Sequence, residues 1–134
     1  MARCAPAATV PHVIVFSAVV AVVLLAALAV FQVALAAGAP HGHLAWGGQY
    51  RVLPSRLRVG SAVSTALYAV FGVVIWAAAS RASAVGGIGI WVLTAFFGIG
   101  VLMNAISRSR PERLLMTPVV LVLALCCLAI AVRS

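Results

Sequence analysis

Long runs of apolar residues dominate the chain, and polar residues gather in the short segments between them. A charge-free run of about 20 residues is long enough to cross a bilayer as a helix. Lipid offers the backbone no hydrogen-bond partner, so each run must be helical, and the alternating pattern of a membrane β-barrel strand is absent. The pattern predicts an all-α integral membrane bundle of four antiparallel transmembrane helices, over residues 13–37, 57–79, 85–106 and 114–132.

Composition supports the same placement in a membrane. Of 134 residues, 66% are hydrophobic and 7% are charged, whereas a soluble globular domain is about 45–50% apolar and about 25% charged. A soluble fold of this size has too little interior to bury so much apolar surface. Four spans take about 80–90 residues, so we expect one transmembrane domain over 1–134 and no separate soluble domain.

The first apolar run has two interpretations. Ala34-Leu35-Ala36 has the A-x-A form of a signal-peptide cleavage site. The apolar region of a signal peptide, however, is only about 7–15 residues long. Because residues 13–37 form a much longer run, we favour a transmembrane span that is retained.

The second and third predicted spans are rich in small residues. Small or hydroxyl-bearing side chains recur every four residues in the second span, and five glycines occur in the third. Small residues let membrane helices approach closely, and the connection over 80–84 is short. We therefore expect these spans to be antiparallel neighbours and the packed centre of the bundle. The alternative is a polar cavity lined by Ser61, Ser64, Thr65 and Tyr68.

Charge is distributed unevenly between the two ends of the spans. Nine arginines and one acid give a net charge of +8. The arginines lie at the ends of apolar runs and not on a clustered basic face, so no nucleic-acid partner is expected. Six belong to the segments 38–56 and 107–113 and the adjoining helix start, whereas Arg3, Arg81 and Arg133 lie opposite. The positive-inside rule predicts that loops 38–56 and 107–113 are cytoplasmic and both termini are outside.

The use of arginine without lysine, together with abundant alanine, valine and glycine, is typical of a GC-rich bacterial genome. The expected location is therefore a bacterial cell membrane, which the chain crosses several times.

The loop over 107–113 carries the only acid, Glu112. Ser109 and Glu112 have the S-x-x-E spacing of a capping box, in which each side chain bonds the backbone N–H of the other residue. The fourth helix should therefore begin near Arg110. We assign Glu112 a structural role, as a helix cap and a partner for Arg108 or Arg113, because a catalytic carboxylate usually needs a second group.

Pro118 lies further along the fourth predicted span and removes a backbone donor there. The neighbouring Thr117 hydroxyl is expected to help satisfy the backbone groups that the proline frees.

The loop over 38–56 is long for a compact bundle, on the same side as loop 107–113, and rich in aromatic residues and glycine. One interpretation is an interfacial anchor whose rings lie among lipid headgroups. The other is a lid over the mouth of the bundle. His41 and His43 are too few for a metal site, and no metal or cofactor is predicted.

Two amides, Gln32 and Asn104, lie near the same end of their helices. Polar side chains in lipid tend to face the bundle interior. They either form a hydrogen bond between the two helices or contribute to a polar pocket beneath loop 38–56 that Arg58 and Arg113 close. The candidate pocket residues are Gln32, Trp46, Arg58, Tyr68, Asn104, Glu112 and Arg113.

Two sequence blocks support a resemblance. The first contains Gly38-Ala-Pro40, Trp46-Gly-Gly48, Leu53-Pro54 and Leu57-Arg58 before Ser61; the second contains Asn104, Ser107-Arg108-Ser109, Glu112-Arg113 and Pro118. Together with the four spans, they resemble a family of small four-helix membrane proteins of actinobacteria and bacilli. The resemblance implies the fold and the membrane location, and it implies no activity and no catalytic residue.

Three functions are compatible with these features of the sequence. The chain has no acid pair, no Ser-His-Asp arrangement and no phosphate loop, which favours a non-enzymatic accessory or structural membrane component. Its expected partners are the lipid bilayer and either a second copy or another membrane protein.

The alternative is a small transporter or a bundle that binds a lipid or another small amphiphile at the face of loops 38–56 and 107–113. The first span has Gln32 and no acid, which disfavours proton-coupled cation export. An amphiphile with an anionic head suits the arginines at the mouth better. The third function, an intramembrane enzyme that uses His41, His43 or Glu112, lacks the partner groups that acid–base chemistry needs.

Overall fold

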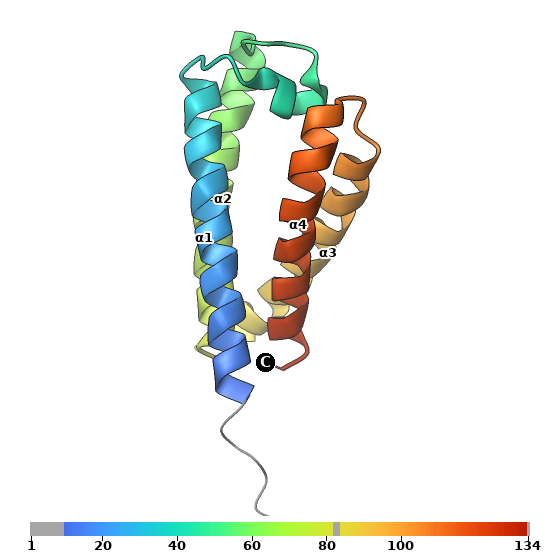
Figure 1. Ribbon diagram of the computed structural model, residues 1–134. Helices are drawn as coiled ribbons and strands as arrows, with labels where there is room; N and C mark the ends of the chain where they lie inside the picture. Colours follow the sequence, from blue (N-terminus) through green and yellow to red (C-terminus); the bar gives the residue numbers. More distant parts are fainter. Residues whose placement is uncertain (1–9, 82–83, 134) are drawn as a thin grey trace, which may run out of the picture.

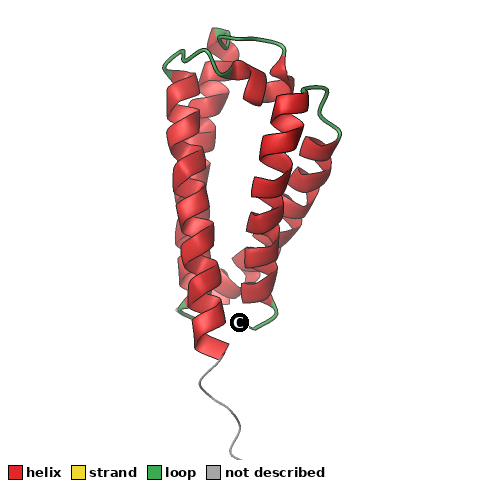
Figure 2. Ribbon diagram, in the orientation of Figure 1, coloured by secondary structure: helices red, strands yellow, loops and turns green. Residues whose placement is uncertain are grey.

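The computed structural model describes residues 10–81 and 84–133, and this part of the chain forms helices and loops without strands (Figure 2). The four long helices are α1 (Val10–Ala36), α2 (Ser55–Ala79), α3 (Ala84–Ala105) and α4 (Arg110–Ala131), and two short 3₁₀ helices, η1 (Gly42–Leu44) and η2 (Trp46–Gly48), lie between α1 and α2 (Figure 1). The predicted all-α bundle is confirmed. Arg3, which entered the charge comparison, and residues 82–83 of the second connection lie outside the described residues.

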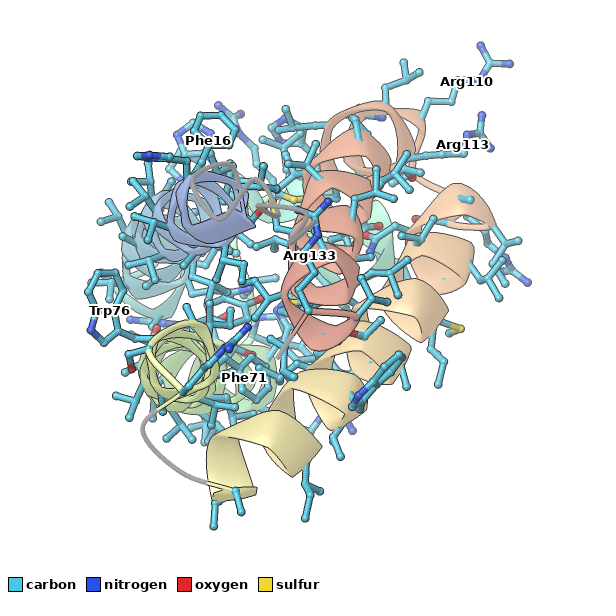
Figure 3. The ribbon with its side chains drawn as sticks, turned by 90° about the horizontal axis from the view of Figure 1, so that it is seen from below. Phe16, Phe71, Trp76, Arg110, Arg113 and Arg133 are labelled. Atoms are coloured by element: carbon cyan, nitrogen blue, oxygen red, sulfur yellow. The ribbon has the colours of Figure 1, made fainter. Side chains whose placement is uncertain are left out.

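Each of the four long helices has an apolar stretch of 22–25 residues, which is long enough to cross a membrane. Their outward surfaces are apolar. Phe16 and Trp76, for example, are 70% and 55% exposed and point away from the bundle (Figure 3). Because a bilayer is the solvent that accommodates such a surface, the chain is a multi-pass membrane protein.

The helices form two closely packed pairs. The most extensive contacts join α1 to α2 and α3 to α4, and the contacts between α1 and α4 and between α2 and α3 are smaller. The two pairs converge at the end that holds the C-terminus and diverge toward the 38–56 loop (Figure 1). The prediction that the second and third spans form the packed centre is therefore wrong, because small residues permit close approach without specifying the partner helix.

The contact between α2 and α3 is closest near their connection. A Cβ atom at Gly86 would lie 2.9 Å from the backbone nitrogen of Ala78, so glycine allows the two backbones to meet there. Further along, the Phe71 ring meets the rings of Phe96 and Phe97 edge-on, with centroids 5.2 and 5.9 Å away. These aromatic side chains are larger than glycine and hold the helices further apart.

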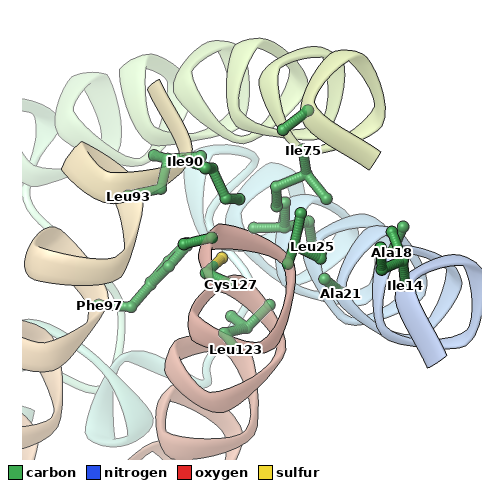
Figure 4. Packing of buried hydrophobic residues seen from close by; sticks show 13 residues of the cluster. Ile14, Ala18, Ala21, Leu25, Ile75, Ile90, Leu93, Phe97, Leu123 and Cys127 are labelled. Carbon is green, nitrogen blue, oxygen red and sulfur yellow. The ribbon is translucent and has the colours of Figure 1, made fainter. Parts of the chain in front are cut away.

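The apolar core lies at the end of the bundle away from the 38–56 loop. All four helices contribute buried side chains to it (Figure 4). Its members include Ile14, Leu25, Ile75, Ile90, Phe97, Leu123 and Cys127. A second, smaller cluster packs Ala45 and Leu53 of the loop against Leu35 of α1. Among the buried polar residues, Gln32, Ser61 and Glu112 lie in the helix turns nearest the loop, whereas Ser17 lies on α1 beside the apolar core.

Helix α4 continues through Pro118 without interruption. The Thr117 hydroxyl, predicted to satisfy backbone groups freed by the proline, is instead buried and has no hydrogen-bond partner among the described residues. That prediction is wrong, because the hydroxyl does not bond the carbonyls of the preceding turn.

Candidate functional site

Loop 38–56 crosses the end of the bundle at which α1 and α2 lie apart from α3 and α4 (Figure 1). Its base is closed by the Gly42 N–H, which donates to the Arg51 carbonyl at 2.9 Å. Trp46, Gly47 and Gly48 have φ angles of 54°, 79° and 70°, a left-handed conformation that is uncommon for a tryptophan. The chain therefore makes a tight turn at Trp46 that brings the loop back over the bundle.

Two hydrogen bonds join this loop to the start of α4 and the loop before it, and a third orients the carboxylate that accepts one of them. The Ser109 hydroxyl donates to the His43 carbonyl at 2.6 Å, and the Gly47 N–H donates to Glu112 Oε2 at 3.1 Å. The Ser107 hydroxyl donates to the same carboxylate oxygen at 2.5 Å. Loops 38–56 and 107–113 therefore lie at the same end of the molecule and are joined by hydrogen bonds.

The capping box at α4 is half formed. The Glu112 N–H donates to the Ser109 hydroxyl at 3.4 Å, which is the predicted cap. The Ser109 N–H, however, donates to the Ser107 hydroxyl at 3.2 Å and not to Glu112. The prediction that Glu112 pairs with Arg108 or Arg113 is also wrong. Its carboxylate accepts hydrogen bonds from the Gly47 N–H of one loop and the Ser107 hydroxyl of the other.

The Trp46 side chain is held from below by α2. Its indole Nε1–H donates to the Ser61 hydroxyl at 3.2 Å, and Ser61 is fully buried. A Cβ atom at Gly60 would lie 2.8 Å from the indole ring, so the ring rests on bare backbone. With 42% of its surface exposed, Trp46 covers the helix ends as well as facing outward, which favours the lid over a purely interfacial anchor.

Beneath the lid lies a partly open cavity of about 130 Å³ that residues of all four helices and of loop 38–56 line. Its walls combine apolar side chains with amides, a phenol and a carboxylate. The lining residues are Leu28, Phe31, Gln32, Leu44, Ala45, Trp46, Tyr68, Asn104, Glu112, Met116 and Val120.

The two amides in the cavity do not bond each other. The Gln32 side chain lies beside the Tyr68 side chain, and Asn104 Nδ2 donates to the Gly100 carbonyl of its own helix at 2.8 Å. The predicted bond between Gln32 and Asn104 is therefore not formed. Gln32 Oε1 is buried and has no hydrogen-bond partner among the described residues.

Five of the seven candidate pocket residues line this cavity, and two do not. The five are Gln32, Trp46, Tyr68, Asn104 and Glu112. The Arg58 Nε donates to the Ala36 carbonyl at 2.7 Å and borders a separate surface depression. The Arg113 guanidinium donates to the Ser107 carbonyl at 3.5 Å, and it points away from the bundle together with Arg110 (Figure 3). Arginines therefore surround the mouth without entering the cavity.

A second, outer depression of about 410 Å³ shares Asn104 and Glu112 with the cavity. Arg108, Gln49 and Ser107 are among its other lining residues. Asn104 and Glu112 thus separate the outer depression from the cavity inside the bundle.

The alternative polar cavity proposed for the second span does not form as a group. The Ser64 and Thr65 hydroxyls donate to the carbonyls of Gly60 and Ser61, one turn earlier in their own helix. Thr65 faces a groove of about 680 Å³ between α1 and α2, which is lined almost entirely by apolar side chains.

Sequence reasoning missed the apolar walls of the cavity. Leu28, Phe31, Met116 and Val120 are four of them. Met116 and Val120 follow Glu112 at successive intervals of four residues, which places the three side chains along one face of α4. The helical spacing from Glu112 was the signal that could have identified them.

Metal-ligating residues are sparse in the described part of the chain, where no group of three or more His, Cys, Asp or Glu side chains occurs. The rings of His41 and His43 lie 6.3 Å apart, and both residues are exposed.

Comparisons with known proteins give no match to a protein-family model, to a curated protein or to a solved structure.

Proposed function

We propose that this chain is a membrane-embedded binding protein that holds a small molecule, or the compact head of an amphiphile, in the cavity beneath loop 38–56. The observation that carries the proposal is the unpaired Gln32 Oε1, which lies in a 91% buried side chain lining that cavity. A buried polar atom without a partner costs about 1–3 kcal/mol. Such a cost is typical of a site whose partner is a ligand.

The lid supports the same proposal. Trp46, Ala45 and Leu44 close the cavity from the loop end, and the loop is held to the helices by side-chain hydrogen bonds. The outer depression that shares Asn104 and Glu112 offers a route of entry. Loops over a rigid scaffold commonly cover binding sites in this way.

The proposed function is binding without catalysis. Glu112 is the only acid in the chain, and its Oε2 already accepts two hydrogen bonds. General acid–base chemistry usually needs a second positioned group. Among the residues that line the cavity, Tyr68 is the only other titratable side chain.

A panel of four-carbon probes tests the binding. The probes are butylammonium, butyrate and 1-butanol, titrated calorimetrically into the protein in phosphatidylcholine nanodiscs, with empty nanodiscs as the blank. We expect saturable binding of at least one probe, and we expect Val120→Phe to abolish it, because Val120 lines the cavity. Val122→Phe is the matched control, since Val122 is 40% exposed on the same helix and does not line the cavity. The absence of any saturable binding would contradict the proposal.

We propose that the protein resides in a bacterial plasma membrane with the lid end facing the cytoplasm. Among the described arginines, six lie at the lid end and Arg81 and Arg133 lie at the opposite end. An excess of arginine in short loops marks the cytoplasmic side.

Thiol labelling in intact cells tests the orientation. In a variant whose three native cysteines are replaced by serine, we expect a membrane-impermeant maleimide to label Val132→Cys and to leave Gln49→Cys unlabelled. Both positions are exposed, so access decides the result. Labelling of Gln49→Cys alone would show that the lid end faces outside, which is the opposite of the proposed orientation.

The accessory or structural role, which the sequence favoured, is the second proposal and makes a different prediction. It requires a stable partner or a homo-oligomer that survives purification in mild detergent. A monomer without a partner that binds one of the probes would favour the binding function over this alternative.

A further inference from the structure

We propose that the cavity beneath the lid recognises a protonated amine, an inference that rests on the proposed binding function. The occupant would be a compact ammonium group with N–H donors, either free or as the head of a lipid. The residues that determine this preference are Gln32 and Glu112, with aromatic side chains around them.

The buried atom of the cavity lining that lacks a hydrogen-bond partner in the described chain is an acceptor. Two donors of its lining side chains are already used: Trp46 Nε1–H bonds Ser61, and one N–H of Asn104 Nδ2 bonds the Gly100 carbonyl. Gln32 Oε1, by contrast, has no partner in the described chain, and the Glu112 carboxylate borders the cavity. A ligand that satisfies these atoms must bring donors.

The charge in the cavity also favours a cation. Glu112 is 92% buried, and no lysine, arginine or histidine is among the lining residues. Its neighbours on the protein side, the Gly47 N–H and the Ser107 hydroxyl, are neutral donors. The guanidinium groups of Arg58 and Arg113 bond backbone carbonyls outside the cavity. The structure therefore points away from the anionic headgroup expected from the arginine-rich mouth.

Aromatic rings add a second source of attraction for a cation. Phe31, Trp46 and Tyr68 line the cavity from three different elements. A cation near the face of such a ring gains about 0.5–2 kcal/mol, with the larger values where water is excluded.

The volume limits the size of the occupant. A cavity of about 130 Å³ is slightly smaller than the engineered apolar cavity of about 150 Å³ that accommodates benzene. About five or six heavy atoms therefore fit, which corresponds to an ammonium group with a short carbon chain.

Calorimetric titration of butylammonium into nanodiscs tests the inference. Phosphatidylcholine is the lipid because its head has no N–H donor. We expect saturable binding of butylammonium, and weaker binding, by about tenfold or more, of butyltrimethylammonium, butyrate and 1-butanol, since one charged hydrogen bond is worth about 1.5–3 kcal/mol.

Two matched variants show whether Gln32 makes the contact. We expect Gln32→Leu to weaken butylammonium binding about tenfold or more and Thr117→Val to leave it unchanged. Each variant removes a buried polar atom that has no partner in the described chain, but only Gln32 lines the cavity.

The source of the amine is distinguished by a second lipid. If nanodiscs containing phosphatidylethanolamine lower the apparent affinity for butylammonium, the natural occupant is a lipid head with a primary amine. If they do not, it is a free amine.

Other outcomes overturn the inference. Tighter binding of butyrate than of butylammonium, abolished by Val120→Phe, would mean that Gln32 presents its NH₂ group to the cavity. This result would contradict the preference for an amine and would still support the proposed binding function. Equal binding of butylammonium and butyltrimethylammonium would exclude a role for N–H donors. If none of the probes binds saturably, both the preference for an amine and the proposed binding function are contradicted.

Discussion

At the scale of single residues, the interior contains two buried polar atoms for which the described chain provides no partner, Gln32 Oε1 and Thr117 Oγ1. Replacing a buried, unsatisfied polar group by an apolar group of similar size removes its desolvation penalty, about 1–3 kcal/mol. We expect Thr117→Val to raise the free energy of unfolding by about 1 kcal/mol. Gln32→Leu also removes the contact of the amide with Tyr68, so its gain should be smaller. Equilibrium unfolding in mixed micelles measures this effect, and a loss of stability in Thr117→Val would contradict the assignment of an unpaired hydroxyl.

Ser109 joins two structural roles in one hydroxyl. It caps α4 by accepting from the Glu112 N–H, and it donates to the His43 carbonyl of the lid. We expect Ser109→Ala to destabilise the protein by about 1–3 kcal/mol, the sum of a lost cap and a lost hydrogen bond. Ser64→Ala is the control, because the Ser64 hydroxyl bonds only a carbonyl of its own helix. Equal effects of the two variants on the unfolding midpoint would show that Ser109 does not hold the lid.

The sequence revealed half of the role of Glu112. The S-x-x-E spacing predicted the cap at Ser109, which forms. It did not predict that the carboxylate accepts from Gly47, 65 residues away, because that contact depends on how loop 38–56 folds over the helices. Local spacing determines local bonds, and long-range bonds require the tertiary structure.

At the scale of elements, the lid depends on a glycine in α2. A Cβ atom at Gly60 would overlap the Trp46 ring at 2.8 Å, whereas a Cβ at Gly72 meets no atom within 4 Å. We expect Gly60→Ala to displace Trp46 and raise its quenching by acrylamide, and Gly72→Ala to leave the quenching unchanged. The measurement uses a Trp76→Phe and Trp91→Phe background, so that Trp46 is the sole tryptophan. Unchanged quenching in Gly60→Ala would mean that the ring does not rest on α2.

The junction of α2 and α3 provides a second pair of glycines for comparison. A Cβ atom at Gly86 would lie 2.9 Å from Ala78 N and 3.0 Å from Ala77 C, and backbone atoms cannot move aside as a side chain can. A Cβ atom at Gly87 meets no atom within 4 Å. We expect Gly86→Ala to destabilise the protein by about 1–3 kcal/mol and Gly87→Ala not to do so, as measured by thermal unfolding in detergent. Similar melting temperatures for both variants would contradict this helix contact.

Helix positions were predictable from the sequence, but helix pairing was not. Runs of apolar residues predicted all four helices, with differences of a few residues at the ends. Glycines in the third span suggested close packing on the second, whereas α3 has its most extensive contacts with α4. Gly100, for example, faces Val120 of α4. A small side chain reports that some helix comes close, and the connections and larger side chains determine which.

At the scale of the whole molecule, apolar and polar interiors are separated along the bundle. The apolar core occupies the end that holds the C-terminus, and the cavity occupies the lid end, where the helix pairs diverge (Figure 1). Polar residues at matching depths of different spans, such as Gln32 and Asn104, predicted this pocket from the sequence. The arginines misled the same reasoning, because Arg58 and Arg113 have long side chains that reach backbone carbonyls outside the cavity. The positions of the arginines in the sequence correctly indicated a positive charge around the mouth, but they did not indicate the charge inside the cavity.

The central claim, that the cavity under Trp46 binds a small ligand, is tested most directly by Trp46 fluorescence in the Trp76→Phe and Trp91→Phe background. Butylammonium is titrated into this protein in phosphatidylcholine nanodiscs, with and without Val120→Phe. The account predicts a saturable change in emission that Val120→Phe removes, because Trp46 and Val120 line the same cavity. A change that rises linearly without saturation, or that is identical in both proteins, would contradict it.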